Sequence, residues 1–171
     1  NLYMNIIEIF TKSLFLIISF DRDLWEIIIL SLYVSISALI IASILGLLIG
    51  YYIALKKFLF KSFILIVLNS LMGIPPVVVG LIVYFMFASG GPLGVLQLLY
   101  TPTAMIIAQV IIIFPIVTSI SHEIFDQNWK EYKDQLRSIN MPFFGVAFII
   151  IKHSYFLVIT ALLSAFGRAI S

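Results

Sequence analysis

Residues 27–55, IIILSLYVSISALIIASILGLLIGYYIAL, contain no charged side chain. A helix needs about 20 predominantly apolar residues to cross the hydrocarbon core of a membrane. This stretch is longer, so it predicts a transmembrane helix and with it the class of the whole fold. Small residues recur along the helix at steps of three or four: Ser31, Ser35, Ala38, Ala42, Gly46 and Gly50. Such a face lets helix backbones approach closely, so we expect it to pack against another helix; a face that lines a pathway is the alternative.

The composition of the chain is typical of a membrane protein. Of its 171 residues, 63% are hydrophobic and 11% are charged, whereas a soluble domain has about 45–50% apolar and about 25% charged residues. The net charge of +2 is too small and too dispersed for a nucleic-acid-binding surface. The absence of cysteine excludes disulfides, thiolate metal sites and cysteine catalysis. The length fits one domain, residues 1–171.

Three further apolar stretches predict membrane spans at residues 63–88, 103–121 and 148–167. Residues 6–20 are apolar but too short, because 15 residues at about 1.5 Å each cover only about 22 Å of a core of about 30 Å. We expect them to form an interfacial amphipathic helix, with a tilted span as the alternative. The predicted fold is therefore an all-α membrane bundle of about four transmembrane helices.

Basic residues in the short loops predict the orientation, because cytoplasmic loops are enriched in Lys and Arg. The loops after the first and third spans are the basic ones, with Lys56, Lys57 and Lys61 in one and Lys130, Lys133 and Arg137 in the other. The loop after the second span has none. The first and third loops are thus predicted to be cytoplasmic, and residues 1–24 extracytoplasmic. Since the chain begins with Asn and not Met, we expect its true N-terminus to be missing. Since it ends without a charge cluster, we expect it to be truncated before a further span.

The second predicted span is interrupted by MGIPPVVVG, residues 72–80. Pro75 and Pro76 have no N–H donor and Gly73 adds conformational freedom, so the helix should break there. Transporters use broken helices to line binding sites, whereas a kink that serves packing is the alternative. Arg168, near the outer end of the fourth span, is either an interfacial side chain or a countercharge for a passing anion. Gly73, Pro75, Pro76 and Arg168 are our candidates for a translocation path.

Motifs of enzymes and nucleotide-binding proteins are missing from the sequence. No glycine-rich loop ends in Lys-Ser or Lys-Thr, so the chain does not bind ATP through a P-loop. His122 and His153 are isolated, without the spacing of a metal site, and no G-x-S-x-G motif supports hydrolase chemistry. We therefore expect neither enzymatic activity nor a metal or cofactor in this chain.

Residues 128–145, NWKEYKDQLRSINMPFFG, form a charged island between the third and fourth spans. An apolar stripe at steps of four, three, four and three runs through this region: Phe125, Trp129, Tyr132, Leu136 and Ile139. The stripe predicts a short amphipathic helix, in which Asp126 and Lys130 form a favourable i,i+4 pair. We expect this island to dock a cytoplasmic partner, with a solvated connector as the alternative.

The end of this helix can also be predicted. Asn140 tolerates left-handed geometry, and Pro142 disfavours a helical conformation at Met141. The helix should therefore end near Ile139, turn at residues 140–141, and be followed by a new helix that begins at Pro142.

The island resembles the cytoplasmic coupling loop of ABC importer permeases, in which Glu-Ala-Ala is followed by three residues, a Gly and an apolar stretch. Here YKDQLRSIN is followed by MPFFGVAFIII, with Asp134, Gln135 and Leu136 at the Glu-Ala-Ala positions and Asn140 at the Gly. Four other stretches resemble segments of tungstate-type permeases in the same order: LMGIPPVVVGLIVYFMF, SGGPLG, TPTAMIIAQVIIIFPIV and SAFGRAIS. The resemblance to this group of molybdate, sulfate and tungstate permeases extends over residues 24–171.

The resemblance implies a permease subunit of an ATP-driven importer for an oxyanion, with tungstate as the expected substrate. Two copies of the permease would form the pathway in a bacterial or archaeal cell membrane, in contact with lipid. A cytoplasmic ABC ATPase would hydrolyse ATP, and an extracytoplasmic binding protein would deliver the anion. Residues 122–145 would be the coupling loop, with six residues in contact with the ATPase: Trp129, Tyr132, Asp134, Gln135, Leu136 and Asn140.

Two other functions remain open from the residues alone. The chain could be a non-transporting membrane scaffold that docks a cytoplasmic partner through residues 122–145. It could also be an ion-coupled secondary transporter, although the predicted spans lack the buried acidic residues that proton relays require.

Overall fold

The computed structural model describes residues 8–12 and 22–170, and all the regular elements within them are helical. This confirms the predicted all-α fold. Of the predicted interfacial helix at residues 6–20, only residues 8–12 are described, and they form a short helical turn. The rest of that predicted helix lies outside the described residues.

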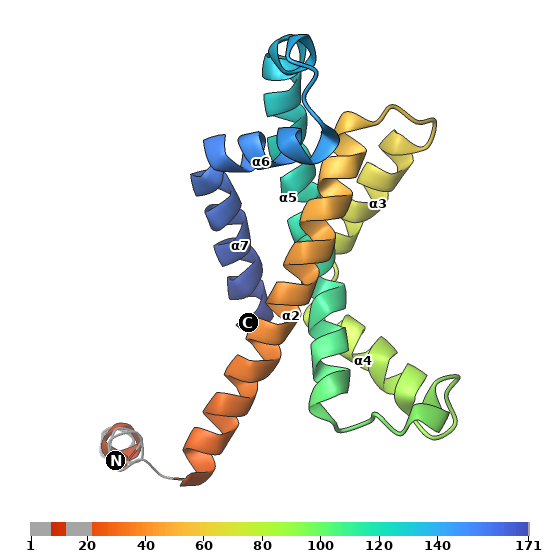
Figure 1. Ribbon diagram of the computed structural model, residues 1–171. Helices are drawn as coiled ribbons and strands as arrows, with labels where there is room; N and C mark the ends of the chain where they lie inside the picture. Colours follow the sequence, from red (N-terminus) through yellow and green to blue (C-terminus); the bar gives the residue numbers. More distant parts are fainter. Residues whose placement is uncertain (1–7, 13–21, 171) are drawn as a thin grey trace.

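Helices α2 (Arg22–Leu55) and α5 (Pro102–Ser138) cross near their centres and form the framework of the molecule (Figure 1). The small-residue face of α2 is buried from Ser35 to Gly50, and Gly46 and Gly50 lie directly against α5. A Cβ atom at Gly50 would lie 2.7 Å from the carbonyl oxygen of Thr118. The predicted packing face is thus confirmed, although Ser31, at its start, is exposed.

The second predicted span consists of two helices, α3 (Lys61–Met72) and α4 (Pro76–Phe87), which are bent by 100° relative to each other. The span predicted at residues 63–88 thus corresponds to a bent pair of helices, and its predicted interruption is confirmed. The helix ends because Pro75 is extended, with φ −62° and ψ 137°, and Pro76 begins the next helix at a position where its missing N–H is tolerated. We refer to residues 73–75 as the break.

Helix α5 has 37 residues and includes both the third predicted span and the helix of the charged island. The prediction of a separate short helix is wrong, because charge marks where a helix leaves the membrane and does not end the helix itself. The predicted end is confirmed: Asn140 has a left-handed φ of 49°, and the N–H of Met141 donates to the carbonyl of Leu136 at 3.2 Å. Pro142 then precedes α6 (Phe143–His153).

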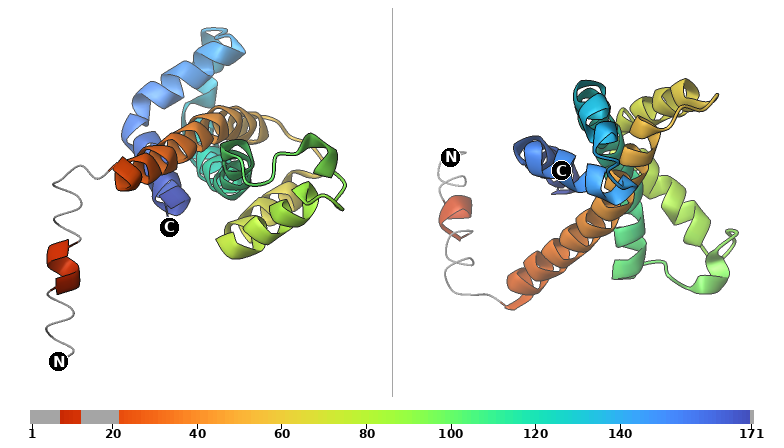
Figure 2. Two further views of the ribbon diagram at one scale, coloured as in Figure 1. Left: turned by 90° about the horizontal axis from the view of Figure 1, so that it is seen from below. Right: turned by 45° about the horizontal axis from the view of Figure 1, so that its top comes forward.

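The fourth predicted span is also bent, by 82°, between α6 and α7 (Tyr155–Ile170). The span predicted at residues 148–167 includes this bend, which the sequence did not predict. We call the bend at Ser154 the elbow. Beyond it, α7 returns along the α2–α5 pair, while α4 extends to another side of that pair (Figures 1 and 2).

Two helices, α2 and α5, are long and apolar enough to cross a membrane, and each bent pair counts as a further span if it crosses as a unit. The buried core is thin and lies mainly where α2, α5 and α7 meet, with Ala38, Ala42, Val117 and Ala165 at its centre. Many large apolar side chains instead face outwards, which is expected for helices surrounded by lipid.

Candidate coupling and translocation sites

The end of α5, the turn and α6 together form what we call the α5–α6 arm, residues 122–153. The structure divides the six predicted coupling residues between the inside and the outside of this arm. Asp134, Gln135 and Asn140 are exposed, whereas Trp129 and Tyr132 are half-buried. Leu136 is buried with Val146 and Ile150 of α6, so it holds the arm together and is not available for a partner. The exposed group is the part of the prediction that can contact another protein.

Tyr51, at the end of α2, connects the arm to the rest of the molecule. Its hydroxyl donates a hydrogen bond to the carbonyl of Phe143, at the start of α6. Its ring lies against Phe125 and Phe143, with centroids 4.9 Å and 4.5 Å away. Sequence reasoning missed this residue, because its partner lies 92 positions further along the chain.

Charged side chains secure the base of the arm. Lys61, in the first turn of α3, places its Nζ 3.4 Å from Oδ1 of Asp126 and donates to the carbonyl of Ala54 at 3.2 Å. Lys130 pairs with the other carboxylate oxygen of Asp126 at 2.6 Å, which confirms the predicted i,i+4 pair. The ends of α2, α3 and the arm are thus joined at one point.

The predicted path residues come together at the other end of α7. Nη2 of Arg168 donates to the carbonyl of Ile74, in the break, at 3.3 Å. In a regular α-helix the N–H of Val78 would donate to the carbonyl of Ile74, four residues earlier. Here it donates to the Pro75 carbonyl, which leaves the Ile74 carbonyl to accept from the arginine side chain. The sequence named the break and the arginine separately, and the structure shows that they are in contact across 94 positions.

Gln109 of α5 lies beside this contact and was missed from the sequence. Its Nε2 donates to the carbonyl of Ala169 at 3.1 Å and to Oγ of Ser35 at 3.4 Å, so that α2, α5 and α7 are linked. Its Oε1 is buried and accepts no hydrogen bond from the part of the chain that the structure describes. The available signal was an amide in the middle of the apolar stretch TPTAMIIAQVIIIFPIV.

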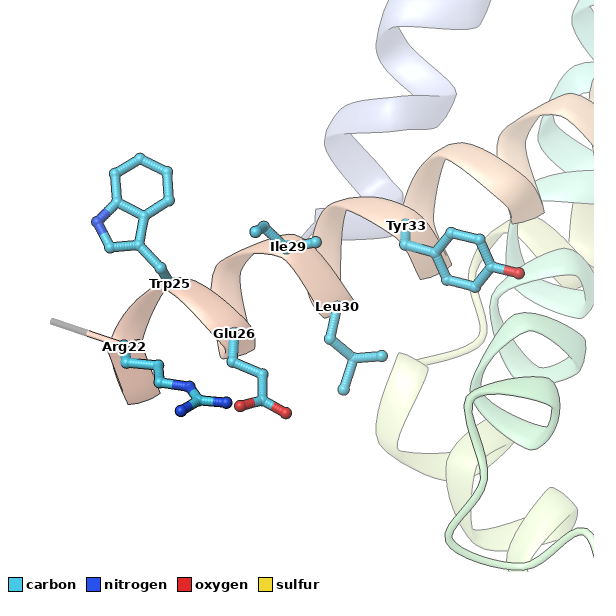
Figure 3. Close-up of a pocket in the computed structure, with 6 residues that line it drawn as sticks. All are labelled: Arg22, Trp25, Glu26, Ile29, Leu30 and Tyr33. Atoms are coloured by element: carbon cyan, nitrogen blue, oxygen red, sulfur yellow. The ribbon is translucent and has the colours of Figure 1, made fainter. Parts of the chain in front are cut away.

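A separate hollow of about 740 Å³ lies along the first turns of α2 (Figure 3). Its described lining comes from one helix: Arg22, Trp25, Glu26, Ile29, Leu30 and Tyr33. Figure 3 shows these six side chains spread along the first turns of α2. A ligand site is marked by convergent polar groups from several elements, and one helix does not supply them, so we do not assign a site here.

No group of three or more potential metal ligands occurs within residues 8–12 and 22–170. That the chain works without a metal or cofactor stays a prediction. The two places that bring predicted residues together are the arm and the contact of Arg168 with the break.

Comparison with known proteins identifies the family. Residues 42–171 match the family described as binding-protein-dependent transport system inner membrane component. A tungstate uptake system permease protein of Peptoclostridium acidaminophilum is 35% identical over 166 residues, which are 97% of this chain and 73% of that protein. A probable anion ABC transporter permease protein of Haloferax volcanii is 36% identical over 141 residues, 82% of this chain and 61% of that protein.

A second tungstate uptake system permease protein, from Campylobacter jejuni, is 28% identical over 162 residues, 95% of this chain and 68% of that protein. The family match extends from the small-residue face of α2 to the end of α7 and includes both sites described above. The chain therefore belongs to the family of inner membrane components of binding-protein-dependent transport systems, the permease subunits of ABC transporters.

Proposed function

We propose that this chain is the permease subunit of an ATP-driven oxyanion importer whose substrate is tungstate. The observation that carries the proposal is the contact of the Arg168 guanidinium with the Ile74 carbonyl in the break. The names of the relatives support the substrate, because two are tungstate uptake permeases and one is a probable anion permease.

The chemistry of this contact suits an oxyanion. A charged side chain at membrane depth is costly and is retained where it serves a pathway or pairs with polar groups. A guanidinium has five N–H donors in a planar fork that matches the oxygens of an oxyanion, so it can hold the Ile74 carbonyl and an anion together. The N–H groups of Gly73 and Ile74 already donate to the Ser70 and Leu71 carbonyls, and the two prolines have none, so the arginine would bind the anion and the backbone of the break would not. Gly73, Pro75 and Pro76 would shape the path beside it, because a Cβ at Gly73 would meet only the Ser70 carbonyl, at 3.5 Å.

The arm would be the docking element for the ATPase. In this proposal Asp134, Gln135 and Asn140 contact the ATPase directly, whereas Trp129, Tyr132 and Leu136 maintain the shape of the arm. The arm is bonded to α2 through Tyr51 and to α3 through Lys61, so a partner that moves it would also move the membrane helices. ATP hydrolysis would take place in that partner. A second copy of the permease would complete the pathway, with the N-terminal segment outside, where a binding protein delivers the anion.

The test is reconstitution of the permease in proteoliposomes with its ATPase and binding protein. Uptake and ATP hydrolysis are measured with tungstate, molybdate, sulfate and no anion. Tungstate should stimulate both activities. Arg168→Ala should lower tungstate uptake at least about tenfold, the effect of losing about 1.4 kcal/mol of interaction, while Arg168→Lys retains part of it. Lys57→Ala, which removes an exposed cation from the loop after α2, is the matched control.

Equal hydrolysis and no uptake under all four conditions, with an intact complex, would refute the importer. Full tungstate uptake by Arg168→Ala would instead refute only the assignment of this arginine to the path.

A further inference from the structure

The elbow between α6 and α7 has no local cause in the sequence. Residues 150–158 contain neither proline nor glycine, the residues that usually mark sharp bends, yet the two helices are bent by 82°. The N–H of Ser154 donates to Ile150 at 2.8 Å, and the N–H of Val158 donates to Ser154 at 3.0 Å. These backbone bonds complete α6 before Ser154 and α7 after it, so they do not set the angle between the two helices. Burial of Val158, Ala161 and Ala165 holds α7 against the rest of the molecule, and the elbow itself needs a contact of its own.

A buried hydrogen bond supplies that contact. Oγ of Ser154 donates to Oδ1 of Asn128, on α5, at 3.2 Å. The amide of Asn128 is held in one orientation, because its Nδ2 donates to the carbonyl of Ile124 at 2.7 Å and its oxygen then faces Ser154. Ser154 and Asn128 are only 7% and 8% exposed. Loss of either group would leave a buried polar atom without its partner, which is unfavourable.

The surroundings of this bond are loosely packed. A cavity of about 160 Å³ lies between α5 and α6 and is lined by Asn128, Tyr132, Leu136, Ile150 and His153, among others. The hydroxyl of Tyr132 is 3.4 Å from Nε2 of His153, at the limit of a hydrogen bond. The cavity therefore leaves room for α6 to shift against α5 at this point, and the Asn128–Ser154 bond opposes that shift.

The other end of α7 is bonded as well. The carbonyl of Ala169 accepts from Gln109, and Arg168 donates to Ile74 in the break. Helix α7 has 16 residues, which at about 1.5 Å each make a rod of about 24 Å. One end of this rod is bonded to the arm and the other to the break.

We propose that α7 transmits movement of the arm to the break, and that Asn128 and Ser154 are the positioning residues that hold the angle at which α7 leaves the arm. This inference rests on the proposed function, because it connects the docking element to the translocation path. Without the bond, the angle at the elbow can change, so the arm moves and ATP is hydrolysed while the break follows only in part.

The test uses the complete transporter in proteoliposomes, with tungstate uptake and ATP hydrolysis measured in the same preparation. The variants are Ser154→Ala, Asn128→Ala and the double variant. The control is Ser164→Ala, because the hydroxyl of Ser164 is exposed and bonds only within α7, to the carbonyl of Thr160. Ser154→Thr keeps a hydroxyl at the elbow and is the rescue variant.

We expect each single variant to lower the tungstate transported per ATP about 3- to 10-fold, the range that a net hydrogen-bond contribution allows. The double variant should be no worse than the singles, because both remove the same bond. ATPase co-purification should be unchanged, and Ser164→Ala and Ser154→Thr should resemble the wild type. A bond that served only folding would lower complex yield instead of this ratio.

Wild-type ratios in Ser154→Ala and Asn128→Ala would overturn the inference, as would an equal loss in Ser164→Ala. If the alanine variants assemble poorly, Ser154→Cys decides, because it is close in shape to serine but a weak hydrogen-bond donor. A reduced ratio in assembled complexes supports the inference, and a wild-type ratio overturns it. Absence of tungstate uptake in the wild type would overturn the proposed function first, so the two failures can be distinguished.

Discussion

Adding one methyl group at Gly50 tests how closely α2 and α5 approach. The Cβ of Gly50→Ala would lie 2.7 Å from the Thr118 carbonyl oxygen, 2.8 Å from Cβ of Ser121 and 2.9 Å from the backbone nitrogen of His122. Two of these atoms belong to the backbone of α5, so the helices themselves must move apart. At Gly46 a side-chain rotation can displace Cγ1 of Val117, at 2.8 Å, but not Cβ of Val117, at 2.9 Å; the nearest backbone atom, the nitrogen of Thr118, is further away, at 3.2 Å.

The magnitude follows from two opposing effects. Overpacking a well-packed contact costs about 1–3 kcal/mol, and a backbone clash belongs at the upper end. Replacing glycine by alanine inside a helix contributes up to about 1 kcal/mol in the opposite direction. Gly50→Ala should therefore lower the free energy of unfolding by about 2 kcal/mol, and Gly46→Ala by less. Gly80→Ala, in α4, has no atom within 4 Å of its new Cβ and should be slightly stabilising.

The assay is thermal unfolding of the detergent-solubilised permease, followed by loss of the monodisperse peak in size-exclusion chromatography. For a chain of this size, about 1 kcal/mol changes Tm by roughly 2–4 °C. Gly50→Ala should thus lower Tm by about 4–8 °C, whereas Gly80→Ala raises it by about 2–4 °C. A Tm for Gly50→Ala at or above that of Gly80→Ala would refute the close backbone contact.

Two further perturbations test the arm. Asp134→Arg should reduce co-purification of the ATPase at least about tenfold, the effect of losing about 1.4 kcal/mol of binding, while Asp23→Arg, which changes an exposed acid in the first turn of α2, leaves it unchanged. Equal retention of the ATPase by both variants would contradict the docking surface. Tyr51→Phe keeps the ring contacts and removes the hydrogen bond to the Phe143 carbonyl. It should lower the free energy of unfolding by about 0.5–1.5 kcal/mol, or Tm by roughly 1–6 °C. An unchanged Tm would contradict that bond.

Local sequence signals predicted the features that local chemistry determines. The break follows from the missing N–H groups of Pro75 and Pro76, and the end of α5 follows from Asn140 and Pro142. The apolar runs identified α2 and the membrane part of α5 because crossing a bilayer sets a minimum length.

The features that the sequence did not predict depend on distant contacts. The elbow needs Asn128 and Ser154 to meet, and no residue near Ser154 indicates a bend. The exposure of the coupling residues likewise depends on α6, which folds back and covers Leu136 while Asp134 remains outside. Periodicity grouped Leu136 with Trp129 and Tyr132 on one stripe, but it could not show that the stripe faces the chain's own next helix.

The continuity of α5 has a mechanical consequence. Helix α2 holds α5 along a length and not at one point. The bonded pair Ser35–Gln109 and the ring pair Tyr51–Phe125 are separated by 16 residues on each helix, about 24 Å, and the glycines of α2 lie between them. A sideways displacement of the end at Ser138 therefore cannot turn α5 about a single contact. The glycines of α2 do more than permit close packing: they make the two helices move as one body.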